Sequence, residues 1–313
     1  MKILAVDIGG SKLLTAIAEI HNGQLRLGDI IHRSLDACTT KEQIIEAVVD
    51  AAAELGTSDF ERIGVTIPGL ASPKDGRWIY APFSDIRDFP IAEIISERFG
   101  NKKVFADNDV NACAWAEKCF GKCCSLDDFL WMTVSNGIGG GLVLNGKVFA
   151  GHNSGAAEIG HFGIANDEVM LINSGSPFRC GCGNLGCLEA EAAGPGIVRR
   201  YSYLKHIESG GISAQQIATL AEQGDAMAML AVEITGTLIG RAASYAVNLL
   251  NLQAVIFGGG VMESFELFQP FIEKEFNKHV FRSANSSVKL EKTALGYKAG
   301  LAGAAAIAVN RLG

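Results

Sequence analysis

A glycine-rich turn with polar residues at both edges is the first candidate for chemistry in this 313-residue chain. In residues 7–12 (DIGGSK) an apolar run ends in the carboxylate of Asp7, which is followed by two glycines, a hydroxyl and an ammonium. Glycines allow the close backbone approach that a phosphate needs, and Asp7 can hold the Mg²⁺ that neutralises it. A hairpin turn with an exposed Asp and Lys is the alternative. The predicted phosphate contacts are Gly9, Gly10, Ser11 and Lys12.

A second glycine turn, residues 136–141 (NGIGGG), repeats this arrangement. Two such turns in equivalent places can offer backbone N–H groups to one polyphosphate. A third glycine cluster, Gly258–Gly260, follows a predicted buried strand and can let an adenosine lie flat against the backbone, although such turns also use glycines for local reasons. The predicted contacts here are Asn136, Gly137, Gly139, Gly140, Gly258 and Gly259.

The segment Asp107–Asp109 (DND) lies where a predicted strand ends and a predicted helix begins. Side chains at such a position point out of the sheet edge, where ligands bind in α/β folds. Asp109 can simply cap the helix. In a kinase, a carboxylate at this place accepts the hydroxyl proton as the oxygen attacks the γ-phosphate.

Three thiols, Cys180, Cys182 and Cys187, form the most specific cluster of the sequence. The glycines between them let the backbone curl, so that they provide three corners of a tetrahedron, and His161 is the candidate for the fourth. Four protein ligands make a closed, structural zinc site rather than a Lewis acid. Buried free thiols or an oxidisable pair are the alternatives.

Two glutamates flank this cluster, Glu158 before His161 and Glu189 after Cys187. Solvated surface carboxylates are the ordinary interpretation. If zinc holds the loops, both glutamates gain a rigid mount from which to bind sugar hydroxyls.

The elements that must position these residues alternate in α/β order. A strand, a glycine turn and two more strands open the chain, and the pattern returns from Phe129 onward. We therefore expect two related α/β domains that face each other across a cleft. The predicted small N-terminal domain covers residues 1–110 plus a C-terminal helix at about 298–313, and the large domain covers 111–297.

Composition excludes several classes of partner. The net charge is −7, and no basic block is present that would follow a nucleic-acid backbone. We expect no nucleic-acid partner and no membrane partner, and we expect a cytoplasmic protein because no signal peptide is evident.

Taken together, these segments resemble the ROK family (repressor, open reading frame, kinase) over nearly the whole chain. The motifs that carry the resemblance are DIGGSK (7–12), GVTIPG (64–69), DNDVNA (107–112), TVSNGIGGG (133–141), AEIGH (157–161), CGCGNLGCLE (180–189) and the tail 294–305.

The resemblance implies a duplicated actin-like ATPase fold of the ribonuclease H-like, hexokinase type. It also implies an ATP-dependent sugar kinase similar to bacterial glucokinases and N-acetylhexosamine kinases, with ATP, Mg²⁺ and structural Zn²⁺, a hexose 6-hydroxyl as acceptor, and a homodimer. Asp109 is then the general base. The implied sugar contacts are Gly69, Asn108, Asp109, Glu158, His161 and Glu189, and His161 also binds zinc.

Two departures from the family pattern concern substrate and nucleotide. Asn136 stands where the family usually has Thr, which alters one expected phosphate contact. Residues 83–88 (FSDIRD) replace a segment that usually contains Asn-Leu and a Trp loop beside the sugar. The sequence is compatible with several hexoses and N-acetylhexosamines.

Two other functions compete with the kinase. A sugar-responsive transcriptional regulator of the same family carries an N-terminal helix-turn-helix, which we do not expect because the first predicted strand begins at Lys2. A non-catalytic sugar-binding member is the other alternative, and the presence of Asp7 and Asp109 argues against it.

Overall fold

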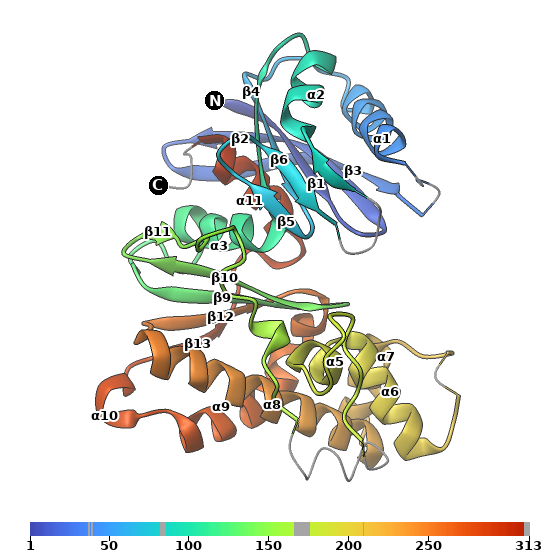
Figure 1. The fold of residues 1–313 in the computed structure, drawn as a ribbon, viewed down its shortest axis with the longest axis vertical. Coiled ribbons are helices and arrows are strands. Elements are labelled where there is room, and N and C mark those ends of the chain that lie inside the picture. Colours follow the sequence, from blue (N-terminus) through green and yellow to red (C-terminus); the bar gives the residue numbers. More distant parts are fainter. Residues whose placement is uncertain (37, 39, 82–85, 166–175, 209, 310–313) are drawn as a thin grey trace. The chain divides into compact units, whose positions relative to one another are not determined.

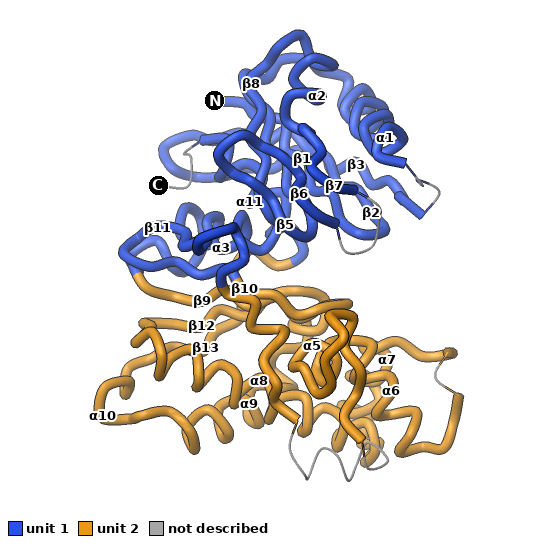
Figure 2. Tube along the Cα trace, in the orientation of Figure 1, with its two compact units in different colours: residues 1–127, 141–156, 297–313 blue, residues 128–140, 157–296 orange. Residues whose placement is uncertain are grey.

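The computed structural model describes residues 1–36, 38, 40–81, 86–165, 176–208 and 210–309 (Figure 1). The chain divides into two compact units (Figure 2). Unit 1 comprises residues 1–127, 141–156 and 297–313, and unit 2 comprises residues 128–140 and 157–296. The domain boundaries expected from the sequence stay a prediction.

The main sheet of unit 1 has the strand order β3-β2-β1-β4-β8. β1 pairs antiparallel with β2, and β2 with β3, whereas β1, β4 and β8 are parallel. The strands are β1 (Lys2–Ile8), β2 (Lys12–His21), β3 (Gln24–Ser34), β4 (Arg62–Ile67) and β8 (Lys103–Asn108). The carboxyl ends of three parallel strands therefore meet at one edge, which is where ligands bind in open α/β sheets.

Local sequence explains the connections of this sheet. Asn22 and Gly23 both have positive φ, 50° and 77°, as the tight turn between β2 and β3 requires. Thr40 and Gln43 form a capping box at the start of α1 (Lys41–Glu54). Gly56, at φ 65°, follows the end of that helix, where glycine readily adopts a positive φ.

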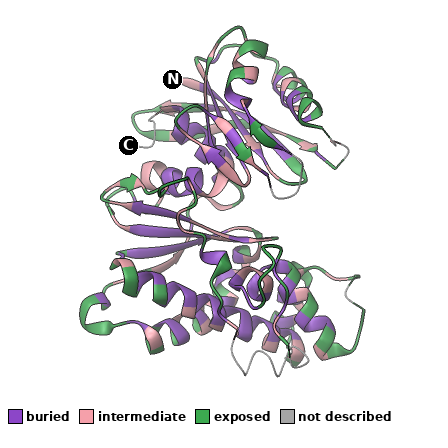
Figure 3. Cartoon of the chain, in the orientation of Figure 1, coloured by how far each residue is buried: buried purple, intermediate pink, exposed green. Residues whose placement is uncertain are grey.

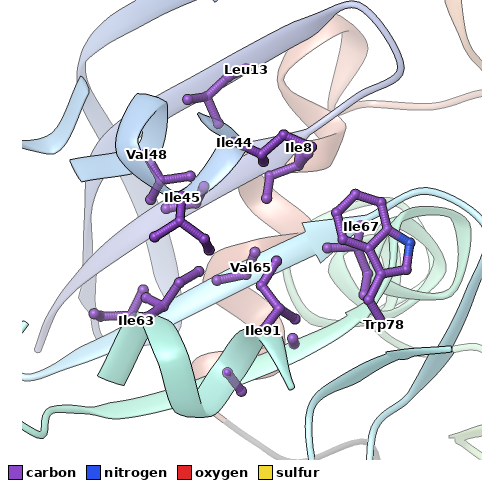
Figure 4. Close-up of a cluster of buried hydrophobic side chains, with 14 of the residues drawn as sticks. Ile8, Leu13, Ile44, Ile45, Val48, Ile63, Val65, Ile67, Trp78 and Ile91 are labelled. Atoms are coloured by element: carbon purple, nitrogen blue, oxygen red, sulfur yellow. The ribbon is translucent and has the colours of Figure 1, made fainter. Parts of the chain in front are cut away.

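The two faces of the unit 1 sheet pack against different helices. On one face, Leu4, Val6 and Ile8 join residues of α1 and α2 in a core cluster. Figure 4 labels Ile8 of this cluster together with Ile44 of α1 and Ile91 of α2. On the other face, Ile3 and Ala5 join α11. Because side chains alternate along a strand, Asp7 shares the α11 face with Ile3 and Ala5. The remaining elements of unit 1 are α2 (Ile91–Arg98), α3 (Asp109–Phe120), α11 (Ala299–Val309), β11 (Lys147–Val148) and a small sheet of β5 (Leu70–Ser72), β6 (Arg77–Tyr80) and β7 (Arg87–Phe89).

The close packing of α11 depends on glycine at position 64. A Cβ on Gly64 would lie 1.8 Å from the carbonyl oxygen of Ala304. Gly64 thus lets the backbone of α11 approach β4, and the neighbouring Thr66 faces the same helix.

The second five-stranded sheet has the order β11-β10-β9-β12-β13. Both sheets have the same order: the third, second and first strands of the repeat lie side by side, and two later strands follow beside the first. This is the duplication expected from the repeated glycine turns. The longer strands of the second sheet are β9 (Phe129–Val134), β10 (Ile138–Leu144), β12 (Ala254–Gly258) and β13 (Lys289–Lys292).

The helices of unit 2 surround α8 (Ala226–Leu250), whose residues are largely buried (Figure 3). By length and composition α8 could cross a membrane, but 61% of its most apolar window is buried in the protein, as in a core helix. The other helical elements are α5 (Leu188–Ala192), α6 (Gly194–Lys205), α7 (Ala214–Glu222), α9 (Phe265–His279), α10 (Arg282–Asn285), η1 (Ile159–His161) and η2 (Gly260–Ser264), and η3 (Gly296–Lys298) precedes α11.

Candidate active site

Three polar residues form a row across the carboxyl ends of the parallel strands of unit 1. Asp7 of β1 is in register with Thr66 of β4, and Thr66 is in register with Asp107 of β8. The hydroxyl of Thr66 donates to Asp7 Oδ1 at 2.7 Å. Residues in register on parallel strands face the same side, so the row lies on the face that α11 covers.

The carboxyl group of Asp7 also lies against the first turn of α11. A Cβ on Gly300 would be 2.2 Å from Asp7 Oδ2. Burial raises the pKa of Asp7, whereas the Thr66 hydrogen bond and the charge of Lys12 lower it. A cation beside this carboxylate would offset the cost of its burial, so the site fits the Mg²⁺ expected from the sequence.

Asp109 is the first residue of α3, and Asn108 rather than Asp109 caps that helix. The side-chain oxygen of Asn108 accepts from the backbone N–H groups of Val110 and Asn111, at 3.0 and 2.9 Å. Its amide nitrogen donates to Gly69 O at 2.8 Å and to Asp109 Oδ1 at 3.1 Å. The Asn108 amide therefore joins Gly69, at φ 86°, to Asp109.

The two carboxylate oxygens of Asp109 have different surroundings. Oδ1 accepts from Asn108 and from Val110 N, while Oδ2 has no hydrogen bond to any residue that the structure describes. Burial, and secondarily the charge of Asp7, raise the pKa of half-buried Asp109 to about 7. Burial likewise raises the pKa of Asp107 to about 7. A carboxyl group with this pKa can accept a proton near neutral pH.

The first glycine turn is closed by a hydrogen bond from Gly9 N to Lys12 O at 2.8 Å. Gly10 and Ser11 are exposed. The ammonium of Lys12 lies 3.0 Å from the hydroxyl of Tyr297 and 4.2 Å from its ring centroid. The turn thus exposes the backbone of Gly10 and the hydroxyl of Ser11, while Lys12 contacts Tyr297.

In unit 2, the second glycine turn and the third glycine cluster lie together. β9 and β12 are parallel, with Gly258 in register with Thr133, so both segments follow the same sheet edge. Gly259 has φ 91°, and a Cβ there would lie 2.5 Å from Val134 O. The structure therefore brings Gly258 and Gly259 beside the start of the Asn136–Gly141 turn.

Glu189 reaches this second turn. Its Oε2 accepts from Ile138 N at 3.0 Å, and a Cβ on Gly137 would lie 2.6 Å from the same oxygen. Oε1 lies 3.8 Å from Cys180 Sγ. Glu189 thus links the cysteine cluster to the turn predicted to bind phosphate, a connection that the sequence did not indicate. Asn136 is exposed, and Gly140 lies against Ala157 O.

The four predicted metal ligands converge. One ligand atom from each of His161, Cys180, Cys182 and Cys187 lies within 4.8 Å of the others. Cys182 Sγ and Cys187 Sγ are 3.7 Å apart, and Cys180 Sγ is 3.6 Å from His161 Nδ1. Zn–S bonds of about 2.3 Å give tetrahedral edges of about 3.8 Å, so this donor set fits zinc.

Glu158 lies on the other side of His161. Its Oε2 is 3.9 Å from His161 Nε2, while Nδ1 faces the thiols. A carboxylate near the second ring nitrogen is common for metal-binding histidines. Both side chains are exposed enough to meet a ligand.

The structure collects the predicted residues into one group in each unit. Asp7, Gly69, Asn108 and Asp109 lie at the sheet edge of unit 1, and Glu189 connects the second glycine turn to the cysteines in unit 2. The sequence analysis assigned no role to Thr66, which donates to Asp7, or to Gly300, which packs against it. Thr66 stands within the GVTIPG motif and Gly300 within the tail 294–305, but neither motif indicates a contact with Asp7. Of the atypical segment 83–88, residues 83–85 lie outside the described residues.

Comparison with known proteins identifies relatives over the whole chain. A sequence model of the ROK family matches residues 3–311. The glucokinase of Thermotoga maritima is 29% identical over 329 residues, which cover 100% of this chain and 99% of the relative. The DNA-binding transcriptional dual regulator NagC of Escherichia coli is 27% identical over 84% of this chain, which spans 65% of that relative's length.

A solved structure has the same fold. The crystal structure of a ROK family glucokinase from Streptomyces griseus, in complex with glucose and AMPPNP, has a TM-score of 0.84 and 29% identity, covering 99% of each chain. The predicted actin-like α/β fold is thereby confirmed.

Proposed function

Because the chain belongs to the ROK family, we propose that it transfers the γ-phosphate of ATP to a hydroxyl of a hexose or N-acetylhexosamine. The proposed acceptor is the 6-hydroxyl. Support comes from the similarity to glucokinases from T. maritima and S. griseus, the second crystallised with glucose and AMPPNP.

The observation that carries this proposal is the environment of Asp109. Asn108 orients one carboxylate oxygen and leaves the other able to accept a proton. Asp109 takes the proton of the sugar hydroxyl while the hydroxyl oxygen forms a bond to the γ-phosphorus and the bond to the β-phosphate oxygen breaks. The products are a sugar phosphate and ADP.

Asp7, held by Thr66, is the proposed contact for Mg²⁺, which neutralises phosphate charge when bound. The proposed phosphate contacts are Gly9, Gly10, Ser11 and Lys12 of the first turn and Asn136, Gly137, Gly139 and Gly140 of the second. Gly258 and Gly259 are proposed to lie against the nucleoside.

Unit 2 supplies the proposed sugar contacts Glu158, His161 and Glu189. Zinc on His161 and the three thiols would be structural, because the protein fills all four positions. Bound there, it would hold Glu189 and η1 in place through Cys187 and His161. Gly69 and Asn108 are the proposed sugar contacts from unit 1, and Asn108 has to exchange one of its present hydrogen bonds to take that part.

The test is an ADP-release assay with MgATP and a panel of hexoses and N-acetylhexosamines. We expect turnover with at least one sugar, and about a 100-fold or greater loss in Asp109→Asn, which should still bind that sugar. Equal activity in wild type and variant prepared in parallel would remove Asp109 from this role.

The regulator alternative is supported by the 27% identity to NagC. It predicts sugar binding without turnover, together with specific DNA binding. The expected absence of nucleic-acid and membrane partners, the cytoplasmic location and the homodimer stay predictions, and light scattering of the purified protein checks the dimer.

A further inference from the structure

An ion pair without any exposed side-chain surface lies in the interior of unit 2. Arg200 of α6 donates from Nη2 to Glu191 Oε2 of α5 at 2.9 Å. Its Nη1 donates to the backbone oxygen of Glu191, also at 2.9 Å. Taking two charges out of water is costly, and an apolar pair of similar volume often stabilises a core as well or better. Stability alone therefore does not account for this pair.

The pair holds Phe178. The second carboxylate oxygen of Glu191, Oε1, accepts from Phe178 N at 2.7 Å. The guanidinium groups of Arg199 and Arg200 lie 4.6 and 5.6 Å from the centroid of the Phe178 ring. Phe178 is thus bound through its backbone and its ring.

Phe178 begins the segment 178–187, which we call the cysteine loop. Gly186 N donates to Phe178 O at 2.9 Å, and Cys180 N donates to Asn184 O at 2.8 Å, which closes the loop on itself. At its other end, Cys187 caps α5 and accepts from Glu191 N at 3.1 Å. Glu191 therefore binds both ends of the loop, one through its backbone and one through its carboxylate.

We propose that the Glu191–Arg200 pair positions the cysteine loop, so that Cys180 and Cys182 are held at metal-binding distance from Cys187 and His161. Because Glu189 lies on α5 together with Glu191, the pair also fixes the position of the Glu189 carboxylate. This effect on sugar binding rests on the proposed function, whereas the effect on the loop does not.

The test replaces both charges at once. Glu191→Leu with Arg200→Met removes the buried charges together, so the fold should persist, but Phe178 N loses its acceptor. We expect faster amide hydrogen exchange in peptides covering 178–187, and about a 10- to 100-fold faster loss of zinc to a chelator. The KM for the sugar should rise more than kcat falls.

The matched control is the pair Arg241–Glu275, which joins α8 to α9 in the same unit with Nη2 and Oε1 2.5 Å apart. Arg241→Met with Glu275→Leu should leave the exchange of the cysteine loop unchanged. Unchanged exchange in the Glu191/Arg200 variant, with its fold intact, would overturn the proposal.

If that double variant does not fold, the single substitution Glu191→Gln tests the proposal instead. A neutral amide oxygen is a weaker acceptor for Arg200 and Phe178 than a carboxylate, so exchange in the loop should rise by a smaller factor. Unchanged hydrogen exchange of the cysteine loop in this variant would also refute the positioning role of the pair. Should wild-type protein show no kinase turnover, the proposed function fails, while hydrogen exchange still decides the role of the pair.

Discussion

Replacing Asp109 with Asn should raise the free energy of unfolding at pH 8 and leave it nearly unchanged at pH 4. The folded protein raises the pKa of Asp109 from 3.8 to about 7, mainly by burial. The folded state therefore binds this proton more tightly than the unfolded state, and the contribution of Asp109 to stability is lost as pH rises from about 4 to about 7. Asn has no titratable proton in this range, so the variant does not lose this stability as the pH rises.

The magnitude follows from the displacement of the pKa. A carboxyl whose pKa moves from 3.8 to about 7 disfavours its charged form by about 4 kcal/mol. Because Asp109 is half-buried, water screens part of this unfavourable energy. The value of about 4 kcal/mol is therefore an upper limit for the increase in the free energy of unfolding at pH 8. About 1 to 3 kcal/mol would still shift the urea midpoint measurably.

Urea unfolding at pH 4.5, 6, 7 and 8 measures the effect, and Asp107→Asn is the matched control. Burial also raises the pKa of Asp107 to about 7, so this variant should gain stability over the same pH range. Both variants should therefore be more stable than wild type at pH 8 and similar to it at pH 4.5, whatever their effect on turnover. A variant that is destabilised at pH 8, or equally affected at every pH, would refute the reasoning about a buried charge.

Four further predictions concern rate, packing and metal. The kcat/KM for sugar phosphorylation should fall about tenfold between pH 8 and pH 6, because protonated Asp109 is no base; a flat profile would contradict the pKa of about 7. Gly300→Ala puts a Cβ 2.2 Å from Asp7 Oδ2 and should lower kcat/KM for MgATP about 100-fold in steady-state assays. Gly64→Ala, whose Cβ would meet Ala304 O at 1.8 Å, should destabilise by about 3 kcal/mol or more in urea unfolding, and a wild-type midpoint would count against that packing. Cys182→Ser should weaken zinc retention about tenfold or more in a chelator competition, and unaltered zinc content would exclude Cys182 as a ligand.

Features that depend on a few neighbouring residues could be predicted from the sequence. The capping box of Thr40 and Gln43 and the turn at Asn22-Gly23 are local hydrogen-bonding and φ preferences, and the structure has both. The convergence of the cysteines was predictable for the same reason, since Cys180, Cys182 and Cys187 span only eight residues. The roles of these residues rest on the family resemblance and stay predictions.

One local prediction was decided differently by the structure. The sequence allowed Asp109 as the helix cap, but Asn108 takes that place and Asp109 becomes the first helical residue. The two assignments differ by one position, which propensities do not resolve. The shift matters, because it makes Asn108 the residue that orients the carboxylate of Asp109.

By itself, the sequence determined which segments turn, which begin helices and which donors gather within a short loop, because those outcomes depend on nearby residues. Only the tertiary structure decided which distant groups touch. Thr66 binds Asp7 because β4 pairs with β1 across 59 residues, and Gly300 meets Asp7 because α11 packs on that sheet. Such contacts follow from strand order and helix packing, which are properties of the whole core and leave no local pattern.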